Sequence, residues 1–277
     1  MSKLSIHLIP EHGRPADVAL IKAIQPPVIK IINPDPQKIA DLYAVSPNSL
    51  FVLRNHPRSE QHDDVTHDPE GTGHRHAQET RRDVDLWLAR GVTLPPLDHM
   101  LFPGLNEPQV WSHLDDTVRY YSAYLDTLKS LGLRGTALSL GVGWPGNGGP
   151  GTPPDWTPFG SILGAIKRGN HILELHEYWD HDGPSKNRGW WAERYAKCGW
   201  DVPILIGECG VDEFVSNPKA DPMGRGWKAN LKPEQYMKQL AEYNEMLDQD
   251  QRIIGACIFT TDFGGREWAS FDTDGLD

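Results

Sequence analysis

Two glutamates stand out by the residues that surround them. Glu107 lies in LFPGLNEP, directly after an apolar run, and Glu208 ends another such run in ILIGECG. A pair of carboxylates can share a displacement at an acetal carbon, one acting as nucleophile and the other handling the proton. An unpaired Glu208 buried in an apolar strand would be costly, which favours a chemical role. Asn106-Glu107-Pro108, taken alone, is also typical of a helix start.

The elements that must position these glutamates alternate along the whole chain. Amphipathic stretches predict helices over 76–91, 114–133 and 233–250, the second with apolar residues every three or four positions. Short apolar runs predict strands at 4–9, 28–33, 49–55, 97–106, 135–143, 171–179, 202–210 and 254–262. Apolar strands joined by helices indicate a parallel sheet covered on its outer face.

Eight such strands predict an α/β fold of the closed (β/α)8, or TIM, barrel type. The 277 residues suit one barrel, so we expect residues 1–277 to form a single catalytic domain. Only residues 263–277 follow the eighth strand, so the last helix should be short or missing. Barrel enzymes keep their active sites at the carboxyl ends of the strands, where Glu107 and Glu208 would meet.

Aromatic residues are plentiful on the predicted active face. The chain has ten Trp and eight Tyr, and sugar rings stack on such side chains, although core packing is an equally good explanation for any single one. The candidate platforms are Trp144, Trp156, Trp179, Trp190 and Trp191, with Trp144 and Trp179 preferred.

These motifs together resemble the retaining glycoside hydrolases of clan A, in particular the family-five-like cellulases and mannanases. Asn106-Glu107-Pro108 matches the motif at the end of strand four, Glu208 matches the strand-seven position, and His176-Glu177-Tyr178 matches an H-x-Y pattern on strand six. The resemblance implies that Glu107 is the acid/base and Glu208 the nucleophile. It also implies that Asn106 contacts the sugar 2-hydroxyl, while Tyr178 and His176 orient the nucleophile.

Two correspondences with these enzymes are weaker. Arg54-Asn55-His56 follows strand three, whereas the arginine usually comes from an earlier strand. Strand eight usually provides a tryptophan that stacks on the sugar, but here it reads IFTTDF. The stacking role would then fall to Phe259, Phe263 or Trp268.

Glu174 is a rival carboxylate on strand six. Alternation places Glu174, His176 and Tyr178 on one face of the strand and Glu177 on the other. Glu174 ranks below Glu208 because it lies deeper in the strand, away from the carboxyl-end rim.

A histidine-rich segment at 56–76 leaves a second reaction class open. It holds His56, His62, His67, His74 and His76 among several aspartates, and such side chains can bind a transition metal. The spacing matches no zinc motif and His7 lacks an H-x-H partner, so a solvated loop is favoured over a metal-dependent hydrolase. We therefore predict no cofactor and no metal at the site. A barrel that binds carbohydrate without catalysis is a third reading, one that would tolerate loss of either glutamate.

Composition narrows the partners. The net charge of −11 argues against nucleic acid, and no apolar stretch approaches a membrane span. The resemblance to glycoside hydrolases implies a carbohydrate substrate as the partner. Cys198, Cys209 and Cys257 cannot all pair and are expected to be reduced. The start, MSKLSIHLIP, lacks a signal-peptide core. This leaves the compartment open, and a longer native chain could carry a binding module.

Overall fold

The computed structural model describes residues 2–9, 15–146, 154–189, 191–261, 268–273 and 276, and they form the predicted (β/α)8 barrel. All eight strands are parallel and pair in chain order, and β8 returns to β1 through Leu4 and Ala256 to close the barrel. The strands are β1 (Leu4–Leu8), β2 (Val28–Ile32), β3 (Leu50–Arg54), β4 (Met100–Pro103), β5 (Arg134–Leu140), β6 (Ile172–Trp179), β7 (Ile204–Val211) and β8 (Ile253–Thr261).

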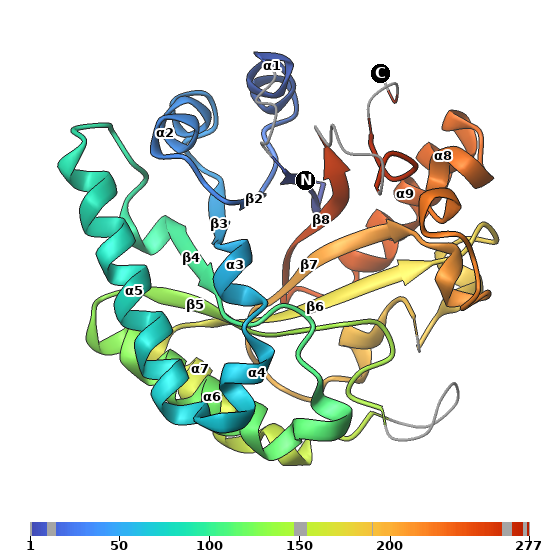
Figure 1. The fold of residues 1–277 in the computed structure, drawn as a ribbon. Helices are drawn as coiled ribbons and strands as arrows, with labels where there is room; N and C mark the ends of the chain where they lie inside the picture. The colour runs from blue at the N-terminus through green and yellow to red at the C-terminus, as the bar shows by residue number, and fades with distance from the viewer. Residues whose placement is uncertain are drawn as a thin grey trace.

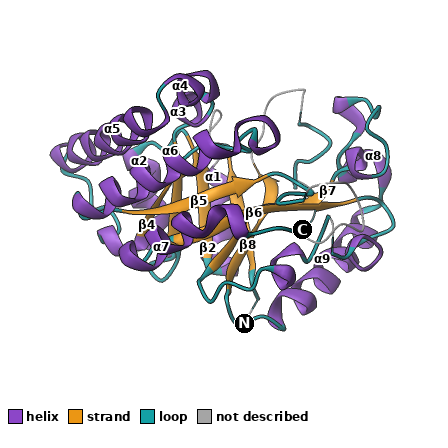
Figure 2. Ribbon diagram, turned by 90° about the horizontal axis from the view of Figure 1, so that it is seen from below, coloured by secondary structure: helices purple, strands orange, loops and turns teal. Residues whose placement is uncertain are grey.

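Helices surround this barrel on its outer side (Figures 1 and 2). The α-helices are α1 (Pro15–Ile24), α2 (Pro36–Val45), α3 (His56–Ser59), α4 (His62–His67), α5 (Pro69–Ala89), α6 (Val110–Ser130), α7 (Gly160–Gly169), α8 (Trp227–Asn230) and α9 (Pro233–Asp248). Short 3-10 turns are η2 (Leu97–His99), η3 (Thr157–Phe159), η4 (Pro184–Asn187), η5 (Arg194–Lys197), η6 (Glu213–Val215) and η7 (Pro222–Gly224).

Local sequence explains where several helices begin. The Asp35 carboxylate accepts hydrogen bonds from the backbone N–H groups of Gln37 and Lys38 at the start of α2, and proline follows it at the first helical position. Asp68 caps α5 in the same way. The predicted apolar stripe of α6 is buried against the barrel through Tyr121, Leu125 and Leu128.

The histidine-rich segment 56–76 is helical, so the expectation of a loop there is wrong. It is not a solvated loop, because α3, α4 and the first turns of α5 occupy it. Asn55 and Asp68 cap two of these helices; Pro57 is the second residue of α3, and α5 begins at Pro69. The capping residues and prolines are helix-start signals that the sequence itself carries.

Helical cover is incomplete at the far end of the chain. Between β6 and β7 the described residues form only the 3-10 turns η4 and η5, with no α-helix. After β8, residues 268–271 form turns and residues 272–273 have no regular structure. The expected short or missing last helix lies partly outside the described residues. The three cysteines are buried and unpaired, as predicted. Of the helices that the structure describes, none combines the length and apolarity needed to cross a membrane.

Candidate active site

The two predicted glutamates meet at the carboxyl end of the barrel. Glu107 follows β4, its backbone N–H donates to the carbonyl of Ser139 on β5 over 3.1 Å, and 46% of its side chain is exposed. Glu208 lies on β7 with only 8% of its side chain exposed. One oxygen of each carboxylate and a ring nitrogen of His176 all lie within 4.8 Å of one another. One carboxylate is therefore open to solvent, and the other is embedded in the barrel.

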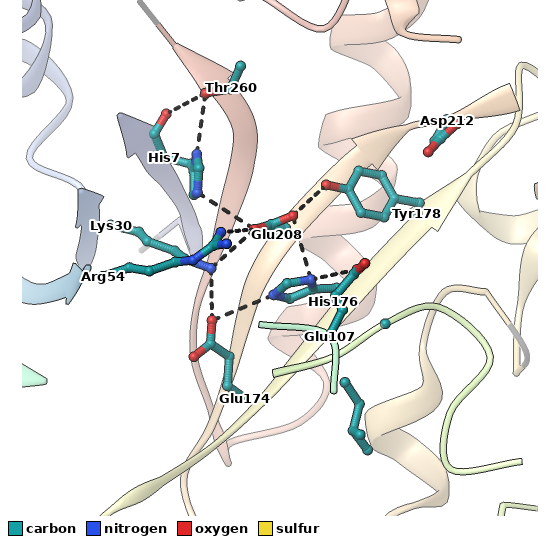
Figure 3. A network of polar contacts seen from close by, with 12 residues as sticks. His7, Lys30, Arg54, Glu107, Glu174, His176, Tyr178, Glu208, Asp212 and Thr260 are labelled. Atoms are coloured by element: carbon teal, nitrogen blue, oxygen red, sulfur yellow. Dashed lines mark hydrogen bonds and ion pairs between the residues drawn. The ribbon is translucent and has the colours of Figure 1, made fainter. Parts of the chain in front are cut away.

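Cationic groups converge on one oxygen of Glu208 (Figure 3). Its Oε1 lies 3.4 Å from Nζ of Lys30 and 3.5 Å from a guanidinium nitrogen of Arg54, and His7 Nε2 is 3.8 Å away. Burial alone would raise the pKa of Glu208, but His176, Lys30, His7 and Arg54 outweigh burial and lower that pKa. The Glu208 side chain is thus held as an anion.

The other oxygen of Glu208 faces strand β6. Tyr178 donates its hydroxyl to Oε2 over 3.0 Å, which is the contact expected from the H-x-Y pattern. His176 Nδ1 lies 3.5 Å from the same oxygen and 2.9 Å from Oε1 of Glu107. His176 thus lies between the two carboxylates.

The charge of His176 follows from these neighbours. The side chain is fully buried, and burial acts to lower its pKa. Glu208, Glu107 and Glu174 together outweigh burial and raise the pKa of His176. The imidazole is therefore biased toward the protonated form beside Glu107.

A lysine that sequence reasoning missed lies beneath Glu208. Lys30 is in the middle of β2 with its side chain 1% exposed, and its Nζ is 2.9 Å from Oε1 of Glu174. Glu174, the rival carboxylate, is fully buried and also accepts a hydrogen bond from the Thr136 hydroxyl. Glu174 thus lies below the cleft, in agreement with its lower rank. The signal for Lys30 was a single charged residue in the apolar run VIKII.

The carboxylates open into a cavity of about 790 Å³. Asn106 lines it, and no described residue donates to its buried Oδ1. His56 also lines the cavity, so two more predicted residues reach the site. Asn55 does not: its side chain caps α3 by accepting the N–H of Arg58 over 3.1 Å.

Several aromatic rings line this cavity. Trp144 lines it as predicted, 6.0 Å from the ring of Trp111, which is 61% exposed and was not predicted. Phe259 and Trp268 also line it, with ring centroids 5.5 Å apart. Trp191 is a further lining residue, whereas Trp190 and Phe263 lie outside the described residues.

Two predicted platforms are wrong. Trp179 is fully buried, stacks 4.7 Å from Tyr243 of α9 and donates Nε1 to Gln239 over 3.0 Å. Strand alternation explains this, because Tyr178 points into the barrel and its neighbour must point out. Trp156 packs 5.1 Å from Trp200 and is only 8% exposed.

One arginine holds the rim of the cavity together. Arg194, in η5, is 4% exposed and donates to the carbonyl of Gly141 over 2.9 Å. It also donates to the carbonyls of Trp144 and His176. The Trp144 loop is thereby tied to strand β6. Gly141 itself lies against Glu107, since a Cβ there would be 3.2 Å from the carboxylate.

The histidines of 56–76 do not gather into a metal centre. All these residues are described, and His76 instead bonds Tyr120 over 3.0 Å and Gln61 over 2.6 Å. Burial lowers the pKa of His76 to about 3, with help from Arg58 and Arg75. In the described part of the chain, only Glu107, His176 and Glu208 stand close enough to share an ion. Lys30 and Arg54 already supply positive charge at Glu208, so this trio does not suit a metal ion.

Comparisons with known proteins agree with the barrel. No family model matches the chain, and no curated protein matches it. Two structures of β-glucuronidase from Ruminococcus gnavus align over 95% of this chain. One structure of the enzyme has a TM-score of 0.56 at 12% identity, and its complex with C6-substituted uronic isofagomine has a TM-score of 0.55 at 11%. A single-substitution variant of BuGH86 in complex with neoagarooctaose aligns over 93% of this chain and 52% of its own, with a TM-score of 0.50 at 14% identity. The chain spans 44% of the length of both β-glucuronidase chains, and the likeness at this identity is one of fold.

Proposed function

We propose that this chain is a retaining glycoside hydrolase that cleaves β-glycosidic bonds in an oligo- or polysaccharide. Glu208 is the nucleophile and Glu107 the acid/base. The observation that carries the proposal is the approach of the two carboxylates, with oxygens within 4.8 Å. Retaining enzymes keep their carboxyl groups about 5 to 5.5 Å apart, whereas inverting enzymes leave about 6.5 to 9.5 Å for a water molecule.

The environments of the two glutamates support different roles. Glu208 is buried among cations and stays ionised, as a nucleophile must. Its oxygen attacks the anomeric carbon while the bond to the leaving oxygen breaks, and Glu107 gives its proton to that oxygen. Glu107 then takes a proton from the water that attacks the ester and releases Glu208. Its partial exposure suits this exchange with leaving group and water.

The cavity supports a sugar on each side of the scissile bond. The Trp144 N–H donates to the carbonyl of Gly141, which lies against Glu107, and the Trp111 ring is 6.0 Å from Trp144. Because Glu107 would protonate the leaving group, these two rings suit the leaving-group sugar. Phe259 lies 6.3 Å from Tyr178 and therefore beside the nucleophile, where the other sugar would sit. Asn106, with its free buried Oδ1, is placed to contact a hydroxyl group. The shared fold with β-glucuronidase adds support at the level of fold alone.

The test is a panel of aryl β-glycosides and soluble polysaccharides with wild type, Glu107→Gln and Glu208→Gln. Exposed Glu245 of α9 provides the matched control Glu245→Gln. We expect both active-site variants to lose most activity while the control keeps it. Azide should restore activity to Glu208→Ala and give the α-glycosyl azide. It should also restore activity to Glu107→Ala, where the product should be the β-glycosyl azide. Hydrolysis that survives both Gln changes in folded protein would overturn the proposal and favour the metal-dependent reading. A folded wild type that binds sugars but cleaves none would point to the carbohydrate-binding barrel.

A further inference from the structure

Lys30 is an unexpected residue for the interior of a barrel. Such interiors are filled mainly by branched apolar side chains, and burying an ammonium group costs several kcal/mol unless it is paired. Lys30 is 0% exposed, and the other four residues of β2 (VIKII) are valine and isoleucine. Its presence therefore requires a partner that offsets the cost.

The partner comes from the opposite wall of the barrel. In the closed order, β2 and β6 lie four strands apart, and Glu174 of β6 meets Lys30 at 2.9 Å. Burial alone would lower the pKa of Lys30, but Glu174 and Glu208 outweigh burial and raise that pKa. Lys30 is thus a charged bridge, since its Nζ also lies 3.4 Å from Glu208 (Figure 3).

Building on the function proposed above, we propose that Lys30 and Glu174 are a positioning pair for the nucleophile. Lys30 holds Glu208 as an oriented anion, and Glu174 keeps Lys30 compensated when Glu208 becomes an ester.

The charge balance of the reaction is the reason for a pair. When Glu208 attacks, its oxygen bonds to the anomeric carbon, the glycosidic bond breaks, and the Glu107 proton moves to the leaving oxygen. The Glu208 side chain then carries no charge. A lone Lys30 would remain as an uncompensated buried cation in the intermediate, which is costly. With Glu174 at 2.9 Å, Lys30 keeps its counter-ion throughout the cycle.

Other groups around the pair define what a substitution would leave behind. The titratable groups that face Lys30 or Glu174 come from β1, β3, β6, β7, β8 and α6, and they are His7, Arg54, His176, Glu208, Cys257 and Tyr121. Arg54 and Glu208 carry opposite charges, and protonated His176 is paired with Glu107 at 2.9 Å, so Lys30 and Glu174 are balanced against each other. Removing either one leaves an excess of one sign next to the nucleophile.

The two single variants should therefore shift Glu208 in opposite directions. Lys30→Met removes a cation and takes from Glu174 its 2.9 Å partner, so the acidic limb of the kcat/KM profile should move up by about one pH unit. Glu174→Gln leaves Lys30 in excess, and the limb should move down. The charge-matched variant Lys30→Met/Glu174→Gln should lie between them. A merely structural role would lower activity at all pH values and leave the limb in place.

A second readout does not depend on activity. Carboxyl resonances of ¹³C-labelled glutamate, with Glu208 assigned by its loss in Glu208→Gln, give the titration of Glu208 directly. Opposite shifts in the two singles support the pair, even if no glycoside is cleaved, in which case the proposed function alone fails. Activity with unmoved or parallel shifts overturns the pair and leaves the function standing. If Lys30→Met does not fold, Glu174→Gln and the double variant decide the question.

Discussion

The imidazole Nδ1 of His176 lies 2.9 Å from Oε1 of Glu107, so a buried side chain of strand β6 holds the exposed carboxylate in place. Because Glu107 is otherwise half exposed, this bond restricts the direction in which its carboxylate can transfer a proton. Proton transfer requires such alignment.

His176→Ala should therefore reduce kcat/KM by about 10²-fold on glycosides with poor leaving groups, which need the proton. The loss should be much smaller on nitrophenyl glycosides. The check is kcat/KM over a series of leaving groups. Tyr178→Phe is the comparison, since it removes the hydroxyl bonded to Glu208 and should slow all members of the series alike. Equal losses across the series in both variants would contradict this assignment of His176.

Trp111→Ala should weaken oligosaccharide cleavage without impairing a substrate that lacks a leaving-group sugar. We expect kcat/KM on oligosaccharides to fall about tenfold, since stacked aromatic contacts contribute about 1 kcal/mol or more. A β-glycosyl fluoride, which has no leaving-group ring, should be hydrolysed as by wild type. Met237→Ala, which removes another exposed apolar side chain, from α9, is the control. Equal losses on both substrates would show that Trp111 does not hold the leaving-group sugar.

Glu208 should make the free energy of unfolding depend on pH in the acidic range. Its pKa is lowered in the folded protein, so its contribution is present above the unfolded value near 4.5. It is lost as the pH falls through the folded pKa. Each unit of difference between the unfolded and the folded pKa of Glu208 corresponds to about 1.4 kcal/mol in the free energy of unfolding. The stability that wild type gains over Glu208→Gln should therefore decrease as the pH falls from about 5 to 3. Urea denaturation of both proteins measures the free energies of unfolding. A pH-independent difference would mean that Glu208 is not held as an anion.

Trp179→Ala should destabilise the protein by about 3 to 5 kcal/mol, because a large ring leaves a cavity against Tyr243. Trp179→Phe should lose less, chiefly the hydrogen bond to Gln239. Denaturant unfolding gives the free energies, and KM should be unchanged in the Phe variant. Trp144→Ala should show the reverse pattern, with a raised KM and a smaller loss of stability.

Dialysis against EDTA should leave activity unchanged. The two cations beside Glu208, Lys30 and Arg54, take the place that a metal ion would need. Activity lost on chelation and restored by Zn²⁺ would contradict this reading of the site.

The residues that meet at the strand ends could be predicted from the sequence. Glu107, His176, Tyr178 and Glu208 could be brought together because a closed parallel barrel places the carboxyl ends of its strands on one rim. Eight strands were located from apolar runs alone, although β4 is limited to Met100–Pro103 within the longer predicted segment.

Other features depend on which way a side chain points. The alternation that places His176 and Tyr178 on one face of β6 also turns Trp179 outward, so the burial of Trp179 follows from the strand pattern. Lys30 could be recognised as unusual, but its partner Glu174 lies 144 residues away and is found only across the closed barrel. Trp111 belongs to the first turn of α6, where its exposure depends on how the helix packs.

The Arg194 guanidinium limits which loops around this cleft can be exchanged between barrels. Loop exchange is a common route to new specificity in barrel enzymes, since loops vary while strands persist. Here the Trp144 loop takes its position from a side chain that lies some fifty residues further along the chain. A graft of residues 144–158 into another barrel would arrive without that anchor. Exchanges that move η5 together with the loop should be the ones that keep the tryptophan aimed at the substrate.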